Sequence, residues 1–145
     1  MSQILENLWL GGADDAYHHG FIERKKITHV LNCAEELGSD HDGAYREGLV
    51  IHHLPMMDED YPDAEKHIRL GASILELWFK AGHTTMVHCR AGVSRSPSIV
   101  IAWMILYQGA TFDEAFNTVV KARNIIYPNW DFMDILRDLK PKLKV

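Results

Sequence analysis

The sequence predicts an α/β domain, with a central, mostly parallel twisted sheet of about five strands flanked by helices. Strand-like and helix-like segments alternate along the chain with short connections between them. The β-branched run over 27–32 is typical of an inner strand of such a sheet. A short apolar strand over 84–87 then leads through a small loop into an apolar helix over 94–107. At 145 residues the chain has the usual size of one domain, so residues 1–145 are expected to form a single unit.

The first half of the chain supplies most of the strands. They are expected over residues 4–5, 8–10, 27–32 and 49–54. Gly11-Gly12 ends the second strand, and residues 14–25 are typical of a surface helix. Pro62 is suited to begin a helix that continues to Phe79, with Ile68, Leu75 and Trp78 on its buried side.

The second half predicts three helices. The segment 94–107 has almost no polar face, so this helix should run through the centre of the domain. Gly109 stops it, and Thr111 with Glu114 forms a capping-box pattern that opens the next helix. A last helix is expected from near Asn129 to a point before Pro141.

Composition narrows the classes of function. A net charge of −5 argues against general nucleic-acid binding, which needs a basic face. No apolar stretch reaches membrane-spanning length, and the N-terminus lacks the pattern of a secretory signal. The nine histidines show no metal-ligand spacing, so neither a metal nor a cofactor is expected. Two cysteines suit a reducing compartment, so the cytoplasm or nucleus is the expected location.

Ten residues, His88 to Pro97, carry most of the chemical information. They place Cys89 and Arg95 around a small loop between a strand and a helix. Backbone N–H groups and a helix N-terminus converge on an anion in such a loop, and this field favours a thiolate, the form of cysteine that attacks. The guanidinium of Arg95 can hold two phosphate oxygens at once. The expected phosphate-binding residues are Arg90, Ala91, Gly92, Val93, Ser94 and Arg95.

The pattern Cys-x5-Arg-Ser preceded by His resembles the cysteine-based protein tyrosine phosphatases, and Ala-Gly-Val-Ser-Arg-Ser resembles their dual-specificity branch, in its small form with a catalytic domain only. The segments 29–32, 54–58 and 127–129 also resemble dual-specificity segments in the expected order. The resemblance implies a protein tyrosine phosphatase-like fold and hydrolysis of phosphotyrosine and phosphoserine or phosphothreonine. It further implies a cysteinyl-phosphate intermediate and a phosphorylated protein as the partner.

The same resemblance suggests roles for further residues. Asp58, in Leu54-Pro55-Met56-Met57-Asp58, matches the general acid; Asp60 is the alternative, and a merely solvated acidic loop is the other interpretation. Ser96 matches the residue that donates a hydrogen bond to the departing thiolate, although helix capping is also open. His88 is expected to support the thiolate through hydrogen bonds to the loop backbone. A Cys-His dyad is disfavoured, because adjacent strand residues point to opposite faces.

Three positions outside the motif are weaker candidates. Asn129 could brace the loop or cap the last helix. Arg123 resembles a rim arginine of some relatives, but it also lies where a cation compensates a helix dipole. Cys33 resembles a cysteine that forms a protective disulfide with the nucleophile in one lipid-directed relative, while a buried free thiol is the alternative.

Two other functions stay open. One is hydrolysis of a non-protein phosphomonoester, such as a phosphoinositide, an RNA 5′ end or a glycan; the absence of lysine from Ala91-Gly92-Val93 argues against the lipid. The other is an inactive phosphate-binding adaptor, although such chains usually lose the cysteine, the arginine or the acid. No feature of the sequence bears on the oligomeric state.

Overall fold

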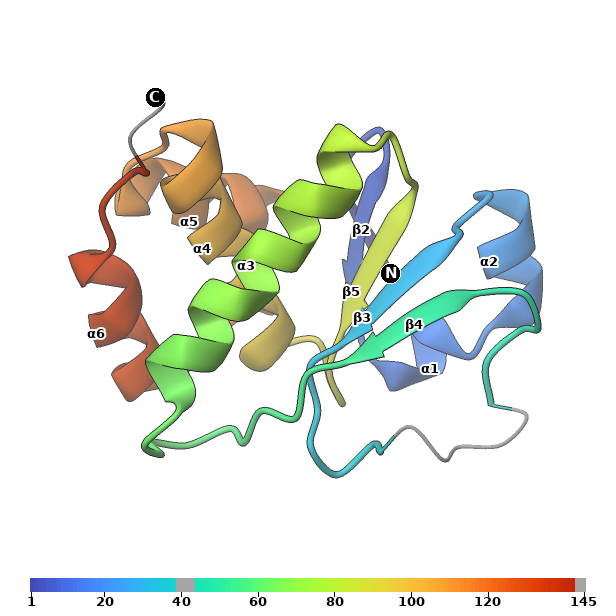
Figure 1. The fold of residues 1–145 in the computed structure, drawn as a ribbon, viewed down its shortest axis with the longest axis horizontal. Coiled ribbons are helices and arrows are strands. Elements are labelled where there is room, and N and C mark those ends of the chain that lie inside the picture. Colours follow the sequence, from blue (N-terminus) through green and yellow to red (C-terminus); the bar gives the residue numbers. More distant parts are fainter. Residues whose placement is uncertain (39–43, 143–145) are drawn as a thin grey trace.

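The computed structural model describes residues 1–38 and 44–142, and its sheet has the predicted architecture (Figure 1). Five strands lie in the order β1-β2-β5-β3-β4. Their bounds are β1 Ser2–Leu5, β2 Leu8–Gly11, β3 His29–Asn32, β4 Val50–His53 and β5 Thr85–His88. The pair β1–β2 is antiparallel, and the pairs β2–β5, β5–β3 and β3–β4 are parallel. The carboxyl ends of four strands therefore meet at one edge, where ligand sites of such sheets form.

Helices cover both faces of the sheet (Figure 1). Their bounds are α1 Ala13–Ala16, α2 His19–Arg24, α3 Ala64–Lys80, α4 Arg95–Gln108, α5 Phe112–Ala122 and α6 Trp130–Asp138. Side chains alternate between the two faces. Leu10 and Val87 belong to the large core against α3 to α6, whereas Trp9 and Met86 join the smaller core with Ile22 of α2.

Helix α4 runs through the centre of the large core, as its apolar sequence predicts. Its residues from Arg95 to Leu106 are buried, and Trp103 is among the largest fully buried side chains. Gly109 ends it in the left-handed conformation with φ 72°, and Thr111 and Glu114 form the predicted capping box of α5. Because α4 is packed on all sides, the loop that precedes it is held firmly at its base.

The prediction of one continuous surface helix over 14–25 is wrong. The segment forms two short helices, α1 and α2, which are separated at Tyr17 and His18. The Nδ1 atom of His18 accepts a hydrogen bond from the amide of Phe21 at 3.0 Å and so acts as the N-cap of α2. A side chain that caps a new helix competes with continuation of the old one. Helix α3 also begins later than predicted, at Ala64, with Asp63 as its N-cap.

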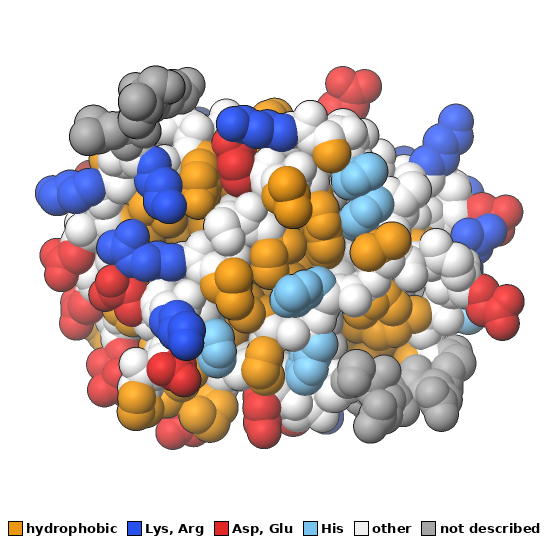
Figure 2. Space-filling model, in the orientation of Figure 1, with side chains coloured by type: hydrophobic (Ala, Val, Ile, Leu, Met, Phe, Trp, Pro, Cys, Tyr) orange, Lys and Arg blue, Asp and Glu red, His pale blue; other side chains and the backbone are white. Residues whose placement is uncertain are grey.

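An apolar surface extends over the outer strand β4 and helix α3. Val50 and Ile51 are exposed, and so are Leu70 and Leu77 of α3. Figure 2 shows the face that carries α3 and β4, on which hydrophobic and histidine side chains occupy the middle, between charged groups at the margins. No helix in the described part of the chain is long and apolar enough to cross a membrane.

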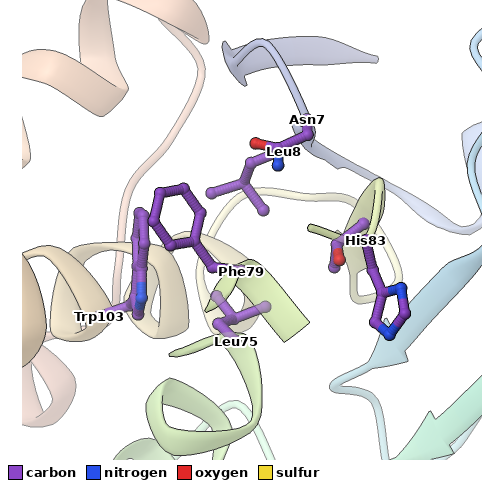
Figure 3. A pocket seen from close by; sticks show the side chains of 7 residues that line it. Asn7, Leu8, Leu75, Phe79, His83 and Trp103 are labelled. Carbon is purple, nitrogen blue, oxygen red and sulfur yellow. The ribbon is translucent and has the colours of Figure 1, made fainter. Parts of the chain in front are cut away.

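A small cavity lies between Leu8, Leu75, Phe79 and Trp103, at the end of the sheet where β5 begins (Figure 3). Its volume is about 10 Å³, which is space for one water molecule and too little for an organic ligand. The hydroxyl of Thr85, which lines it, has no hydrogen-bond partner among the described residues. Cys89 lies at the opposite end of β5, so this cavity is separate from the predicted site.

Candidate active site

The predicted loop lies between β5, which ends at His88, and α4, which begins at Arg95. Cys89 is at its base, with 2% of its surface exposed. The Sγ atom of Cys89 is 3.2 Å from the Oγ atom of Ser96, which lies in the first turn of α4. Ser94 is the N-cap of α4, so Ser96 contacts the thiol and does not cap the helix.

The carbonyl groups of the loop are bound by groups that surround it. The carbonyl of Arg90 accepts from the amide of Ala13, at 2.9 Å. Arg123 donates through Nη2 to the carbonyl of Ala91 at 3.1 Å, and through Nε to that of Gly92 at 2.8 Å. The amide of Tyr127 donates to the carbonyl of Val93 at 2.6 Å.

These four contacts determine where the loop amides point. In a trans peptide the C=O of one residue and the N–H of the next point in opposite directions, and no cis peptide is present in the described chain. Outward carbonyls at 90–93 therefore direct the N–H groups of 91–94 toward the interior of the loop. The result is a ring of donors suited to the oxygens of a phosphate group.

Gly92 is required by this packing. It adopts a φ of 69°, a region that side chains rarely adopt. A Cβ atom there would lie 2.6 Å from the backbone carbon of Gly11 and 2.7 Å from the Nη2 atom of Arg123. The loop therefore packs backbone against backbone on the end of β2.

Arg95 is buried and paired with Glu36, which follows β3. Its Nη1 and Nη2 atoms donate to the two carboxylate oxygens of Glu36 at 2.5 and 2.7 Å, and Nη1 also donates to the carbonyl of Met56 at 3.0 Å. This bidentate pairing uses the end of the guanidinium and leaves the edge formed by Nε and Nη2 for a second anion. Hydrogen bonds from Arg95 are the main cause that lowers the pKa of Glu36 to about 2.

Asp58 lies on the exposed loop that follows Met56, and the side chain of Asn129, directly before α6, holds it in place. The Nδ2 atom of Asn129 donates to its Oδ1 atom at 2.8 Å. Asn129 also donates its amide to the Oγ atom of Ser94 at 2.9 Å and accepts at Oδ1 from the amide of Phe132, as the N-cap of α6. Asn129 therefore contacts Asp58, the N-cap residue of α4 and the first turn of α6. Burial lowers the pKa of Arg95, but its hydrogen bond to Glu36 and the charges of Cys89, Glu36 and Asp58 outweigh this and raise it.

His88 supports the loop from behind. Its Nδ1 atom is 3.0 Å from the carbonyl of Cys89, and its Nε2 atom is 2.7 Å from the hydroxyl of Tyr45. A carbonyl can only accept, so Nδ1 carries the proton and Nε2 accepts from Tyr45. Burial is the main cause that lowers the pKa of His88 to about 4, so the ring is neutral at pH 7. The ring therefore contacts the backbone at Cys89.

The structure also places the other two weaker candidates, Arg123 and Cys33. Arg123 reaches the loop, where its Nη1 atom additionally donates to the Oγ atom of Ser2 at 3.2 Å. Cys33 follows β3, is fully buried, and donates its amide to the carbonyl of His88 at 2.7 Å. Asn32 and His88 are register partners at the ends of β3 and β5, so Cys33 and Cys89 follow side by side directly after these strands.

Two residues that contact the site, Glu36 and Tyr45, were not predicted from the sequence. Glu36 follows the predicted inner strand at the carboxyl edge of the sheet, where ligand sites form. This position in the sequence could have marked it as a candidate site residue. Tyr45 lies in an irregular segment with no pattern that points to His88. Asp60, the alternative acid, is exposed and has no hydrogen bond to the loop in the described part of the structure.

Comparison with known proteins identifies the family of this chain. The model of the dual specificity phosphatase catalytic domain matches residues 8–142. The chain is 34% identical over 145 residues to dual specificity protein phosphatase 26 of Bos taurus, covering 98% of the chain and 68% of that protein. It is 31% identical to dual specificity protein phosphatase 22 of Mus musculus, covering 97% and 73%. The crystal structure of human DUSP28 has the same fold, with a TM-score of 0.84, 24% identity, and coverage of 94% and 93%.

The chain therefore belongs to the dual specificity phosphatase catalytic domain family. It is a phosphatase of the dual-specificity type, with the fold and the loop that the motif predicts.

The neutral state of His88 predicts a pH-dependent loss of stability. Between the ordinary pKa of 6.5 and about 4, the unfolded chain protonates this ring and the folded chain does not. The free energy of unfolding should therefore fall as the pH falls through this window, by up to about 1.4 kcal/mol for each pH unit. Urea unfolding from pH 7 to pH 5 measures the slope, which His88→Asn should reduce and exposed His52→Asn should leave unchanged. An equal slope in all three proteins would contradict the assignment.

Proposed function

We propose that this chain hydrolyses phosphotyrosine and phosphoserine or phosphothreonine in proteins, through a phosphate ester formed on Cys89. The observation that supports this most directly is the ring of inward amides above Cys89, with Arg95 beside it. Such a ring binds a phosphate group and stabilises the charge on its equatorial oxygens during transfer.

In the first step the thiolate of Cys89 attacks phosphorus in line with the departing oxygen. The S–P bond forms as the P–O bond to the substrate breaks. The hydroxyl of Ser96, at 3.2 Å from Sγ, donates a hydrogen bond to the thiolate whenever sulfur carries the charge. In the second step water attacks phosphorus, the S–P bond breaks, and inorganic phosphate leaves.

Asp58 is the proposed general acid. It gives its proton to the departing phenol or alcohol in the first step and accepts a proton from water in the second. Its hydrogen bond from Asn129, which is itself bonded to Ser94, holds the carboxyl at the mouth of the loop. Arg95 presents its Nε and Nη2 edge to two phosphate oxygens, while Glu36 keeps the guanidinium plane fixed.

Several observations favour a protein substrate over the alternatives. Cys89, Arg95 and Asp58 are all present at one site, which disfavours an inactive adaptor. The loop residues Ala91, Gly92 and Val93 supply no positive charge for a highly phosphorylated headgroup.

Both cysteines are free thiols, and a nucleophilic thiol persists in a reducing compartment, which supports a cytoplasmic or nuclear location.

A phosphopeptide panel tests the substrate class. Wild-type protein should release phosphate from phosphotyrosine and phosphothreonine peptides, and far more slowly from phosphoinositides, phosphorylated glycans and RNA 5′ phosphates. Cys89→Ser should lose turnover by at least about 10³-fold, because its hydroxyl is a poor nucleophile without a base, and should still bind inorganic phosphate. Faster release from any non-protein substrate would replace the proposed class.

Replacement of Asp58 tests the acid. Asp58→Ala should slow phenyl phosphate, a poor leaving group, by about 10²-fold or more, and affect an aryl phosphate with a good leaving group much less. Asp60→Ala, in the same exposed loop, is the matched control and should change neither rate. Equal losses of Asp58→Ala on both substrates would move the acid elsewhere.

Cys33 is proposed as a redox partner of Cys89. Peroxide oxidises the thiolate of Cys89 to a sulfenic acid; the Cys33 thiol then attacks that sulfur, its proton leaves with the hydroxyl as water, and a disulfide forms. Neighbouring strands are about 4.8 Å apart, which suits the Cα separation of a disulfide. Burial and the charge of Cys89 raise the pKa of the Cys33 thiol, so Cys89 is the sulfur oxidised first.

Mass spectrometry after peroxide treatment checks this pairing. A peptide that links Cys33 to Cys89 should appear, and a thiol reductant should restore full activity. Cys33→Ser should inactivate irreversibly under the same treatment. If wild type and Cys33→Ser lose activity alike and no linked peptide forms, Cys33 is only a buried core residue.

A further inference from the structure

An exposed apolar surface borders the catalytic loop in the segment between α5 and α6. Ile125, Tyr127 and Trp130 are 54%, 61% and 73% exposed. Three large apolar side chains within six residues are costly to leave in water, and such clusters commonly mark sites of contact. We call these three residues the apolar rim.

The backbone between α5 and α6 directs Tyr127 toward the mouth of the loop. Between α5 and α6 exposure alternates: Ile126 and Pro128 are buried, whereas Ile125 and Tyr127 are exposed. Asn124 and Ile125 form a turn, and in the non-helical stretch 126–129 the alternation places Tyr127 and Asn129 on the same side of the chain. The side chain of Asn129 reaches Asp58, so Tyr127 faces the side of the proposed acid, with Ile125 and Trp130 at the two ends of this stretch.

The segment is also fixed to the loop by its backbone. The amide of Tyr127 binds the carbonyl of Val93, the amide of Asn129 binds the hydroxyl of Ser94, and Arg123 binds two further loop carbonyls. The rim is therefore fixed relative to the phosphate site. Such rigidity lowers the entropic cost of binding the substrate residues that flank the phosphate. Next to the rim, Asp58, Glu59 and Asp60 are exposed and disfavour an acidic neighbour.

We propose that the apolar rim binds an apolar or aromatic side chain close in sequence to the phosphorylated residue of a protein substrate. This inference rests on the proposed function and deepens it, because it assigns a sequence preference to the same site. A phosphorylated side chain that enters the loop places its neighbours over the rim and the adjoining acidic loop. An apolar neighbour buries Trp130 and Tyr127, whereas an acidic neighbour meets Asp58 to Asp60.

Steady-state kinetics on matched phosphopeptides tests the rim. One phosphotyrosine peptide carries Leu or Phe at the positions that flank phosphotyrosine, a second carries Ser there, and a third carries Glu. Wild type should show a kcat/KM about tenfold higher on the apolar peptide than on the serine peptide, equivalent to about 1.4 kcal/mol, and lower still on the acidic one. Trp130→Ser and Ile125→Ser should remove most of this difference. Leu77→Ser is the control, because Leu77 is similarly exposed, at 67%, but lies near the C-terminal end of α3.

A small aryl phosphate separates this inference from the proposed function. It does not extend over the rim, so both rim variants should hydrolyse it at the wild-type rate. Loss of aryl phosphate hydrolysis in wild type would defeat the proposed function itself. Equal kcat/KM of wild type on all three peptides would overturn the rim alone. So would binding of wild type to phosphatidylcholine–phosphatidylserine vesicles that the rim variants lose, without any peptide preference.

Discussion

The site depends on the planarity of four peptide bonds. Each loop carbonyl from Arg90 to Val93 accepts a hydrogen bond from a group outside the loop. Because the peptide bond is planar and trans, the amide that follows each carbonyl points inward. The partners come from α1, from the end of α5 and from the segment before α6. The anion site is therefore built by segments distant in sequence, because Ala13 lies 77 residues before Arg90 and Arg123 lies 31 residues after Gly92. Its geometry is set before any substrate binds, which is the condition for electrostatic stabilisation of a transition state.

Much of the fold was predictable, because its signals are local. The apolar runs gave the strands, the absence of a polar face marked α4 as central, and Thr111 with Glu114 identified the start of α5. The helix over 14–25 was wrong in its continuity because the cap at His18 is a side-chain contact that periodicity does not record. Cys89 and Arg95 were predicted as a pair because one short motif contains both.

The supporting contacts of the site were less predictable for a physical reason. Glu36 meets Arg95, and Tyr45 meets His88, only because β3, β5 and their following segments come together in the folded chain. No spacing in the sequence records such a meeting. Arg123 illustrates the same limit: its sequence context is compatible with a rim arginine or with dipole compensation, and its side chain in fact binds two loop carbonyls.

The exposure pattern within the loop has a practical meaning for protein engineering. Arg90 and Ala91 are exposed, whereas Gly92 is locked against Gly11 and Ser94 is buried at the start of α4. A library designed to alter selectivity should therefore vary Arg90 and Ala91, whose side chains are exposed. It should keep Gly92, which packs against the backbone of Gly11, and Ser94, whose hydroxyl binds the amide of Asn129.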